Sequence, residues 1–154
     1  LYLKPVEMKF DDGLEVTVQT VYRFDPAGRI EIIRRILSVS DPSAELGLQE
    51  YVKGCYGFTE YPEDMKNIDL YLGGEKVLDY TYANKSVVRE GAESAGVTIP
   101  EITTDFSLNS DTAVSAEVKE GHLFEPYYTL KLNYKVTADT KEVSSWLQIK
   151  KTQA

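Results

Sequence analysis

Residues 127–138 read YYTLKLNYKVTA and decide the fold class of this chain. Apolar and aromatic side chains fall on one parity of the run, and Thr, Lys and Asn fall on the other. Successive side chains of a β-strand point to opposite faces, so only a period of two sorts residues in this way. We therefore predict one long amphipathic strand, and we expect Leu130, Leu132 and Tyr134 to face the core.

A long hairpin is predicted near the start of the chain. Residues 14–24 alternate in the same way, and the sequence DPAG at 25–28 has the chemistry of a type I turn. In the returning residues 29–39 the apolar parity shifts, as a β-bulge or a strand buried on both faces requires. A helix over 29–37 competes, because its apolar spacings are three and four, but four Ile and the lack of an N-cap favour a strand.

Shorter segments repeat the β pattern through the rest of the chain. Gly73-Gly74 predicts a tight turn between two strands at 68–72 and 77–82. Further strands are predicted at 97–108, 113–119 and 143–150, whereas 53–67 reads as a loop and 84–96 as a surface connection or a frayed helical turn. Roughly nine or ten strands with turn signals between them predict an all-β protein, an antiparallel two-sheet β-sandwich.

The chain length fits one domain. The 154 residues can bury a core without disulfides or metal, so we expect 1–154 to form a single β-sandwich domain. The sequence begins with Leu1 and its first ten residues lack the features of a signal peptide, which suggests a domain excised from a longer protein. No apolar run approaches the ~20 residues of a membrane helix, so membrane insertion is not expected.

Composition narrows the classes of partner. A net charge of -8 argues against nucleic acid and anionic membranes, which attract proteins rich in Lys and Arg. Eleven Tyr against five Phe and one Trp suit strands and half-wet binding surfaces. No metal-ligand cluster, nucleophile motif or phosphate loop stands out, and no cofactor is expected. An extracellular or cell-surface location is favoured, although the lone Cys55 gives no disulfide signal.

Two single residues, His122 and Cys55, are candidates for a chemical role. His122 is the only histidine, so a Ser-His-Asp arrangement would depend on it, but an exposed loop histidine is the favoured interpretation. Cys55 lies near two glycines that could expose it. A small buried thiol is the favoured interpretation, because no base is visible nearby.

The segment 50–64 is the most suggestive for binding, because it interleaves aromatic and acidic residues. The apolar face of a sugar ring stacks on aromatic planes while its hydroxyls bond to carboxylates. The same side chains could instead pack the loop onto the end of the sandwich. We take as candidate ligand-binding residues Tyr51, Tyr56, Phe58, Glu60, Tyr61, Glu63, Asp64 and His122.

Catalysis and calcium binding are alternative uses of the same segment. Two of its carboxylates could act as the acid and base of a glycosidase, which needs them roughly 5 to 10 Å apart. Calcium prefers six to eight oxygen ligands, and Glu60, Glu63, Asp64 and Asp69 could supply some of them, although their spacing matches no known ligand loop. No metal site is predicted on this basis.

A family resemblance comes from the early hairpin, the run GFTEYPED at 57–64 and the run EGHLF at 120–124. Together they resemble a galactose-mutarotase-like supersandwich, and in particular the last domain of large β-galactosidases, where a Gly-Pro-x-Glu-Asn-Tyr-Pro-Asp run follows a strand. Glu60, Tyr61, Pro62 and Asp64 match part of that run, while the Gly-Pro element is absent. Mutarotases use histidines with an acidic base, and this chain has one histidine.

Three functions remain open from the sequence. The leading hypothesis is a non-catalytic β-sandwich accessory module that contacts an oligosaccharide or neighbouring domains of its parent protein. An immunoglobulin-like interaction or spacer domain, which needs no pocket, is the second. The third is a sugar epimerase or glycoside-processing domain with Glu60 or Glu63 as base and His122 nearby.

Overall fold

The computed structural model describes residues 1–55, 68–79, 84–99, 104–122 and 126–151, with only the backbone at Cys55, Thr104, His122 and Pro126. These ranges contain twelve strands in two antiparallel sheets, which confirms the predicted all-β two-sheet sandwich. The number of strands exceeds the roughly nine or ten that the sequence predicted. The strands are β1 Val6–Lys9, β2 Glu15–Asp25, β3 Arg29–Val39, β4 Leu46–Cys55, β5 Asp69–Leu72, β6 Glu75–Asp79, β7 Ser86–Glu90, β8 Ser94–Ile99, β9 Thr104–Asn109, β10 Ser115–His122, β11 Pro126–Val136 and β12 Glu142–Lys151.

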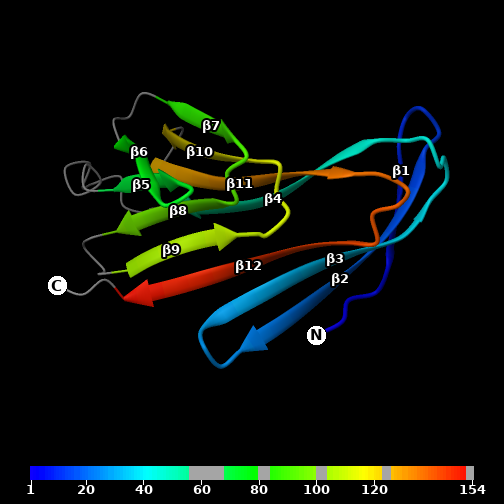
Figure 1. The fold of residues 1–154 in the computed structure, drawn as a ribbon, viewed down its shortest axis with the longest axis horizontal. Helices are drawn as coiled ribbons and strands as arrows, with labels where there is room; N and C mark the ends of the chain where they lie inside the picture. Colours follow the sequence, from blue (N-terminus) through cyan, green and yellow to red (C-terminus); the bar gives the residue numbers. More distant parts are fainter. Residues whose placement is uncertain (56–67, 80–83, 100–103, 123–125, 152–154) are drawn as a thin grey trace.

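The two sheets differ in size. One has eight strands in the order β1-β2-β3-β12-β9-β8-β5-β6, and the other has four in the order β4-β11-β10-β7. Figure 1 shows β1 at one end of the molecule and β5 and β6 at the other, with the long strands β2, β3 and β12 side by side between them. The smaller sheet packs mainly on β5, β8 and β9, and this contact encloses the core.

The long strand predicted from residues 127–138 is β11, at the centre of the smaller sheet. Leu130 and Leu132 are 0% exposed and Tyr134 is 3% exposed, so their predicted orientation toward the core is confirmed. Lys131 and Lys135 alternate with them on the outer face, where they pair with Glu117 and Glu45. The period of two in the sequence therefore separates core from surface along most of the strand, with the outward Thr129 as an exception at 6% exposure.

The β2–β3 hairpin also matches its prediction, and the helical alternative for residues 29–37 is wrong. Its turn is closed by the Asp25 side chain, which accepts from the Ala27 N–H at 2.7 Å, and by Gly28 at a φ of +86°. Val18 pairs with Ile36 while Thr17 pairs with Ser38, so Leu37 is the extra residue of the expected bulge. That extra residue moves the inward position from Ile36 to Val39, whereas Ile32 and Ile33, 6% and 4% exposed, are buried on opposite faces of β3 before the bulge.

The Gly73-Gly74 turn between β5 and β6 is as predicted. The two glycines have φ values of +58° and +81°, which residues with a Cβ rarely adopt. They bring Leu70 opposite Leu78 in an antiparallel pair.

Two expectations about loops are wrong. β4 continues to Cys55, beyond the residue where a loop was expected to begin, and 84–96 contains β7 and the start of β8 rather than a connection or helical turn. The alternation of β4 is hidden because two of its inward positions are the charged Glu50 and the small Gly54. β7 is a short edge strand with no fully buried side chain, and its two apolar residues, Val87 and Val88, are adjacent, so its sequence lacks a period-two signal.

Glu50 lies inside the sandwich because Arg34 meets it there. Its carboxylate accepts two hydrogen bonds from the Arg34 guanidinium, at 3.0 Å from Nε and 2.7 Å from Nη2, and Arg34 Nη1 also donates to Thr20 Oγ1 at 2.7 Å. The bond to Glu50 raises the pKa of Arg34 above its ordinary value. A bidentate pair of this kind joins β4 of the smaller sheet to β3 of the larger.

Candidate functional site

Tyr51 is the one sequence-predicted site residue whose side chain the structure describes. It is 50% exposed and pairs across the strands with Lys131, so it lies on the outer face of the smaller sheet, away from the core. On the same face Lys53 Nζ lies 4.5 Å from the centre of the Tyr127 ring. Tyr51 is thus available to a ligand. Its described neighbours are mainly lysines, and they do not include a cluster of carboxylates.

The other predicted site residues lie at or beyond the limits of the described chain. His122 is the last residue of β10, where its backbone pairs with Pro126, and its side chain is not among those described. Outside the described residues are Tyr56, Phe58, Glu60, Tyr61, Glu63 and Asp64.

A different surface has the geometry of a binding site: the outer face of the eight-stranded sheet. A row of residues crosses four adjacent strands there, because Tyr71 of β5 pairs with Gly96 of β8, Gly96 pairs with Ser107 of β9, and Ser107 pairs with Gln148 of β12. A shallow groove of about 400 Å³ follows this row. We call it the outer groove; its side chains come from Tyr71, Ser94, Thr98, Asp105, Ser107, Asn109, Gln148 and Lys150.

The floor of the outer groove is low because its central residues are small. A Cβ added at Gly96 would lie 3.5 Å from the Phe106 carbonyl oxygen and 3.8 Å from the Tyr71 Cβ, in ordinary van der Waals contact. Tyr71 rises on one side of this floor and Gln148 and Lys150 on the other. The hollow therefore reflects the absence of a side chain, not strain in the backbone.

The polar groups of the groove are only partly used within the protein. Asn109 Nδ2 donates to Ser107 Oγ at 2.9 Å, which leaves the Ser107 hydroxyl hydrogen available to a ligand. Asp105 Oδ1 is shielded from solvent and has no hydrogen-bond partner in the part of the chain described. Trp146 of β12 pairs with Asn109 of β9. The Arg29 guanidinium lies over the Trp146 indole, 5.3 Å from its ring centre.

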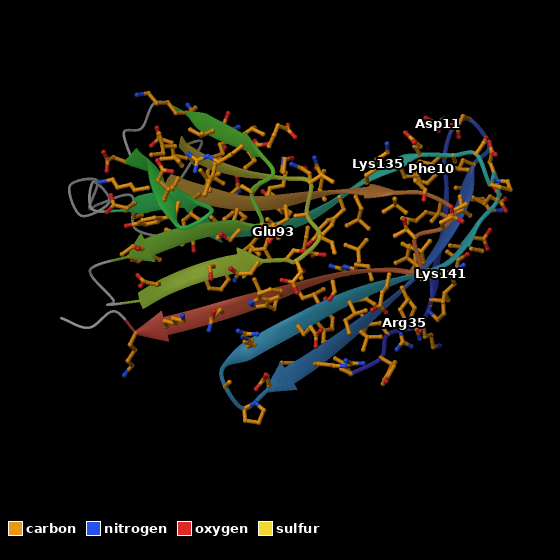
Figure 2. The ribbon with its side chains drawn as sticks, in the orientation of Figure 1. Phe10, Asp11, Arg35, Glu93, Lys135 and Lys141 are labelled. Atoms are coloured by element: carbon orange, nitrogen blue, oxygen red, sulfur yellow. The ribbon has the colours of Figure 1, made fainter. Side chains whose placement is uncertain are left out.

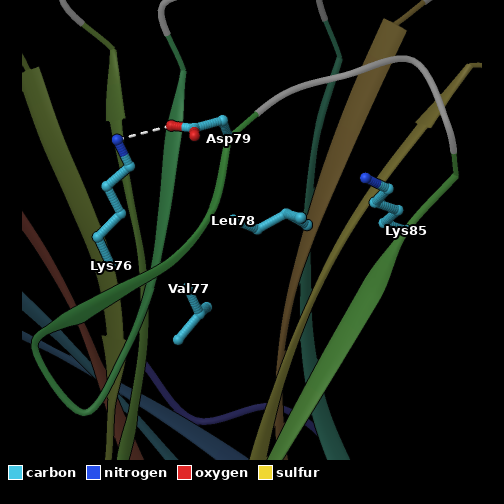
Figure 3. A pocket seen from close by; sticks show the side chains of 5 residues that line it. All are labelled: Lys76, Val77, Leu78, Asp79 and Lys85. Carbon is cyan, nitrogen blue, oxygen red and sulfur yellow. Dashed lines mark ion pairs between the residues drawn. The ribbon is translucent and has the colours of Figure 1, made fainter.

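A second pocket, of about 360 Å³, lies between β6 and the residue preceding β7 (Figure 3). Lys76 and Lys85 stand on its two sides, with Val77 and Leu78 between them. Lys76 is already neutralised, because its Nζ lies 2.6 Å from Asp79 and 3.1 Å from Asp69. These bonds raise the pKa of Lys76 and lower that of Asp79. Among the described lining residues, Lys85 alone has an ammonium group outside an ion pair, and one such group is a weak anion site.

A third pocket, of about 250 Å³, is apolar and lies where β1 and β2 diverge from β4 and β11. Its lining includes Met8, Phe10, Leu46 and Val136, and Figure 2 shows Phe10 at this end of the sandwich. Met8 and Phe10 are substantially exposed. Among its described lining residues, Gln49 has the one hydrogen-bonding side chain that could orient a small polar ligand.

Glu120 is a carboxylate that sequence reasoning passed over. It is 0% exposed on the inner face of β10, and its Oε1 accepts from the Lys85 N–H at 3.5 Å. The Glu120 N–H in turn donates to the Lys85 carbonyl at 3.0 Å. These contacts extend the pairing of β7 with β10, so the described geometry gives Glu120 a structural role.

No group of three or more His, Cys, Asp and Glu side chains within the described ranges could hold a metal ion. No described helix is long and apolar enough to span a membrane.

Comparison with known proteins supports the fold alone. No protein family model and no curated protein matches this chain. Among solved structures, the chain is similar to the crystal structure of the Slr1438 protein from Synechocystis sp. PCC 6803, with a TM-score of 0.58 and 11% sequence identity. The match covers 97% of this chain and 61% of that one, so the chain spans about three fifths of the length of its structural relative.

Proposed function

We propose that this chain is a non-catalytic β-sandwich module that contacts carbohydrate through the outer groove. The observation that carries the proposal is a solvent-facing row of small and polar residues across four strands, bounded by an aromatic side chain. Sugar ligands need an apolar face for their C–H groups and convergent hydrogen-bonding groups for their hydroxyls. Tyr71 supplies the first, and Ser107, Asn109 and Gln148 supply the second.

The exposure of this face supports the proposal further. Ser94, Gly96 and Thr98 alternate with Ala95, Val97 and Ile99 along β8, and only the second set is buried. The outward residues are therefore not required for packing, so a ligand can use them without disturbing the core. As part of the same proposal, the module belongs to a larger extracellular or cell-surface protein, and its relationship to galactose-mutarotase-like domains stays a prediction.

Blocking the groove from its floor tests the proposal. The wild-type chain is screened on a glycan array and binding is measured by calorimetry, with Gly96→Val as the blocking variant. The valine side chain fits the strand and projects into the groove, so the protein stays folded and loses binding at least tenfold. Gly47→Val is the matched control, because Gly47 also lies in a strand and a Cβ there meets nothing within 4 Å.

Two outcomes decide against the groove. If the folded wild-type chain binds no glycan, the spacer hypothesis replaces this proposal. If Gly96→Val and Gly47→Val bind equally well, carbohydrate contact occurs elsewhere, and the predicted segment 50–64 with Tyr51 becomes the next candidate. The epimerase hypothesis would require turnover of a sugar substrate, measured as a change in anomer ratio by NMR.

A further inference from the structure

The strand β4 leaves one long edge of the smaller sheet open. It pairs with β11 over its whole length, from Leu46 to Cys55, and no strand of the described ranges pairs with its other edge. The other edge strands, β1, β6 and β7, have four or five residues each, whereas β4 has ten. An edge strand presents a row of unpaired N–H and C=O groups, which an extended polypeptide can complete by adding one more strand.

The features that usually block such an edge are weak on β4. Residues 46–49 contain neither proline nor a charged side chain, and the inward Glu50 is already paired with Arg34 of β3. This pair places β4 over β3, while β11, on the other side of β4, contacts β8 and β9. The open edge of β4 therefore faces the side where β2 and β1 extend the larger sheet beyond the smaller one.

The apolar pocket of about 250 Å³ lies beside this edge. Residues of both parities of β4 line it, including Leu48 and Gln49, so the pocket reaches the edge of the strand as well as its inner face. Met8 and Phe10 line it from the larger sheet, and they are 40% and 44% exposed. An apolar cavity of ~150 Å³ can hold benzene, so this pocket has room for a large apolar side chain. We call the open edge of β4 and this pocket together the seam.

The overhang of the larger sheet favours a lone segment over a second copy of the chain. Two copies paired through their β4 edges would each bring β1 and β2 into the layer that β1 and β2 of the other copy occupy, so these strands would collide. A single added strand needs one spacing of about 4.8 Å beside β4, and the overhang is two strands wide. The seam thus fits one extended segment.

Charge at the same end of the sandwich indicates what should flank the segment. Asp11 and Asp12 directly follow Phe10 and are exposed, and Figure 2 shows Asp11 near Phe10 at this end. Lys9, which precedes Phe10, is already paired with two glutamates. The net charge of -8 adds to the negative potential, so Lys or Arg at the ends of a segment would be attracted here.

From these observations we infer that the seam binds an extended segment of another polypeptide as a fifth strand of the smaller sheet. The segment has apolar side chains at alternate positions, which enter the pocket, and basic residues at its ends. The seam shares no lining residue with the outer groove, so this inference does not depend on the proposed function.

Fluorescence anisotropy with a labelled peptide tests the inference. The peptide has ten residues, the length of β4, and valine and phenylalanine alternate with threonine between terminal lysines. The wild-type chain binds it at least about tenfold more tightly than a peptide of the same composition with contiguous apolar residues, because only the alternating peptide directs them all to one face. Replacing the terminal lysines with glutamates weakens binding. Absence of binding by every peptide to the folded chain would overturn the inference.

N-methylated peptides separate backbone pairing from apolar contact. Successive amides of a strand point to opposite edges, so methyl groups on every second amide block one edge and leave the other free. One peptide is methylated at its apolar positions and a second at its threonines. We expect one of the two to lose binding at least about tenfold and the other to keep it, because β4 pairs with one edge of the segment. Equal affinities of the two peptides would exclude strand addition.

A pair of variants locates the contact on the protein. Met8→Asn places a polar amide against the bound apolar side chain, so it weakens peptide binding at least about tenfold. Val88→Asn is the matched control, because Val88 is also an exposed apolar residue of an edge strand, at the opposite end of the smaller sheet. Circular dichroism checks that both variants are folded. Equal peptide affinities of the two variants would show that the pocket is not used.

Sedimentation velocity of the chain without peptide distinguishes the other occupant. We expect a monomer. A dimer that Met8→Asn dissociates and Val88→Asn does not would mean that a second copy occupies the seam, and it would overturn the assignment to a separate segment.

Discussion

Alternate residues of the same strands form the two faces of the eight-stranded sheet, and the two faces differ in burial and in side-chain size. On β8 the inward Ala95 and Val97 are at most 1% exposed, and the outward Gly96 borders the outer groove. The inward set must match the smaller sheet in volume, since protein cores are close-packed. The outward set has no such requirement, and its residues are small and polar. Stability and the proposed ligand contact can therefore be altered separately along one strand.

The smaller sheet shows the same division with a different outer face. Inward residues of β11 complete the core, while its outward lysines pair with glutamates of the neighbouring strand and loop. Tyr51 and the Lys53–Tyr127 contact lie on this outer face. The two outer faces of the sandwich thus differ in charge and shape, and among the described residues the face of the larger sheet combines a groove with hydrogen-bonding groups that the protein does not fully use.

The largest expected effect comes from truncating an inward residue. Leu132→Ala removes a fully buried side chain and leaves a cavity, so we expect a loss of about 2 to 5 kcal/mol in the free energy of unfolding. Lys131→Ala, on the opposite face of the same strand, breaks one ion pair of 3.8 Å and costs at most about 1 kcal/mol. Urea denaturation of both variants measures the difference. Equal losses would mean that side chains on the two faces of β11 contribute equally to the free energy of unfolding.

How much of this fold is visible in the sequence depends on how each strand is buried. β11 and the β2–β3 hairpin are predictable because one face of each strand is apolar and the other polar over most of their length. The second half of β4 is not, since Glu50 occupies a core position only by virtue of Arg34 on a distant strand. A partner sixteen residues away in the chain leaves no periodic signal.

A second prediction compares two glycines that lie under tyrosine rings. A Cβ at Gly54 would overlap the Tyr128 ring on the inner face, and one at Gly121 would overlap the Tyr127 ring on the outer face. Tyr128 is 7% exposed and packs within the core, so Gly54→Ala should cost about 1 to 3 kcal/mol through overpacking. Tyr127 can turn toward solvent, and Gly121→Ala should cost less, about the value of the lost Lys53 contact, ~0.5 to 1 kcal/mol.

Thermal unfolding of the two glycine variants, with Gly47→Ala as a control in open space, provides the measurement. A greater loss for Gly121→Ala than for Gly54→Ala would contradict the view that only the inner face is rigid.

The candidate site is less predictable than the fold, for a geometric reason. Tyr71, Gly96, Ser107 and Gln148 are ordinary strand residues spread over 78 positions of the chain, and only the cross-strand register brings them into one row. Register between strands distant in sequence is set by the whole sheet. The aromatic and acidic segment 50–64 attracted the sequence-based prediction because its residues are neighbours in the chain. Polar and aromatic residues that are contiguous in the sequence can be recognised from it, whereas a surface assembled from four separate strands cannot.

The smallest expected effect appears only at alkaline pH, and it sharpens the contrast between inward and outward tyrosines. Burial is the main cause that raises the pKa of Tyr134 to about 12, above the value of about 10 expected in the unfolded chain. Between these two values the unfolded state releases the proton more readily than the folded state, so the stability due to this group is present below pH 10 and falls as the pH rises toward 12. At pH 11 the loss is about 1 kcal/mol. Tyr134→Phe should therefore lose less stability than the wild-type chain between pH 9 and 11, while Tyr51→Phe, at a half-exposed position, should follow the wild-type curve. The urea midpoints of the three proteins are measured across this pH range. The remaining tyrosines are common to the wild type and Tyr134→Phe, so a difference between these two curves reports on Tyr134. Parallel curves would show that the Tyr134 hydroxyl ionises as freely as one in water.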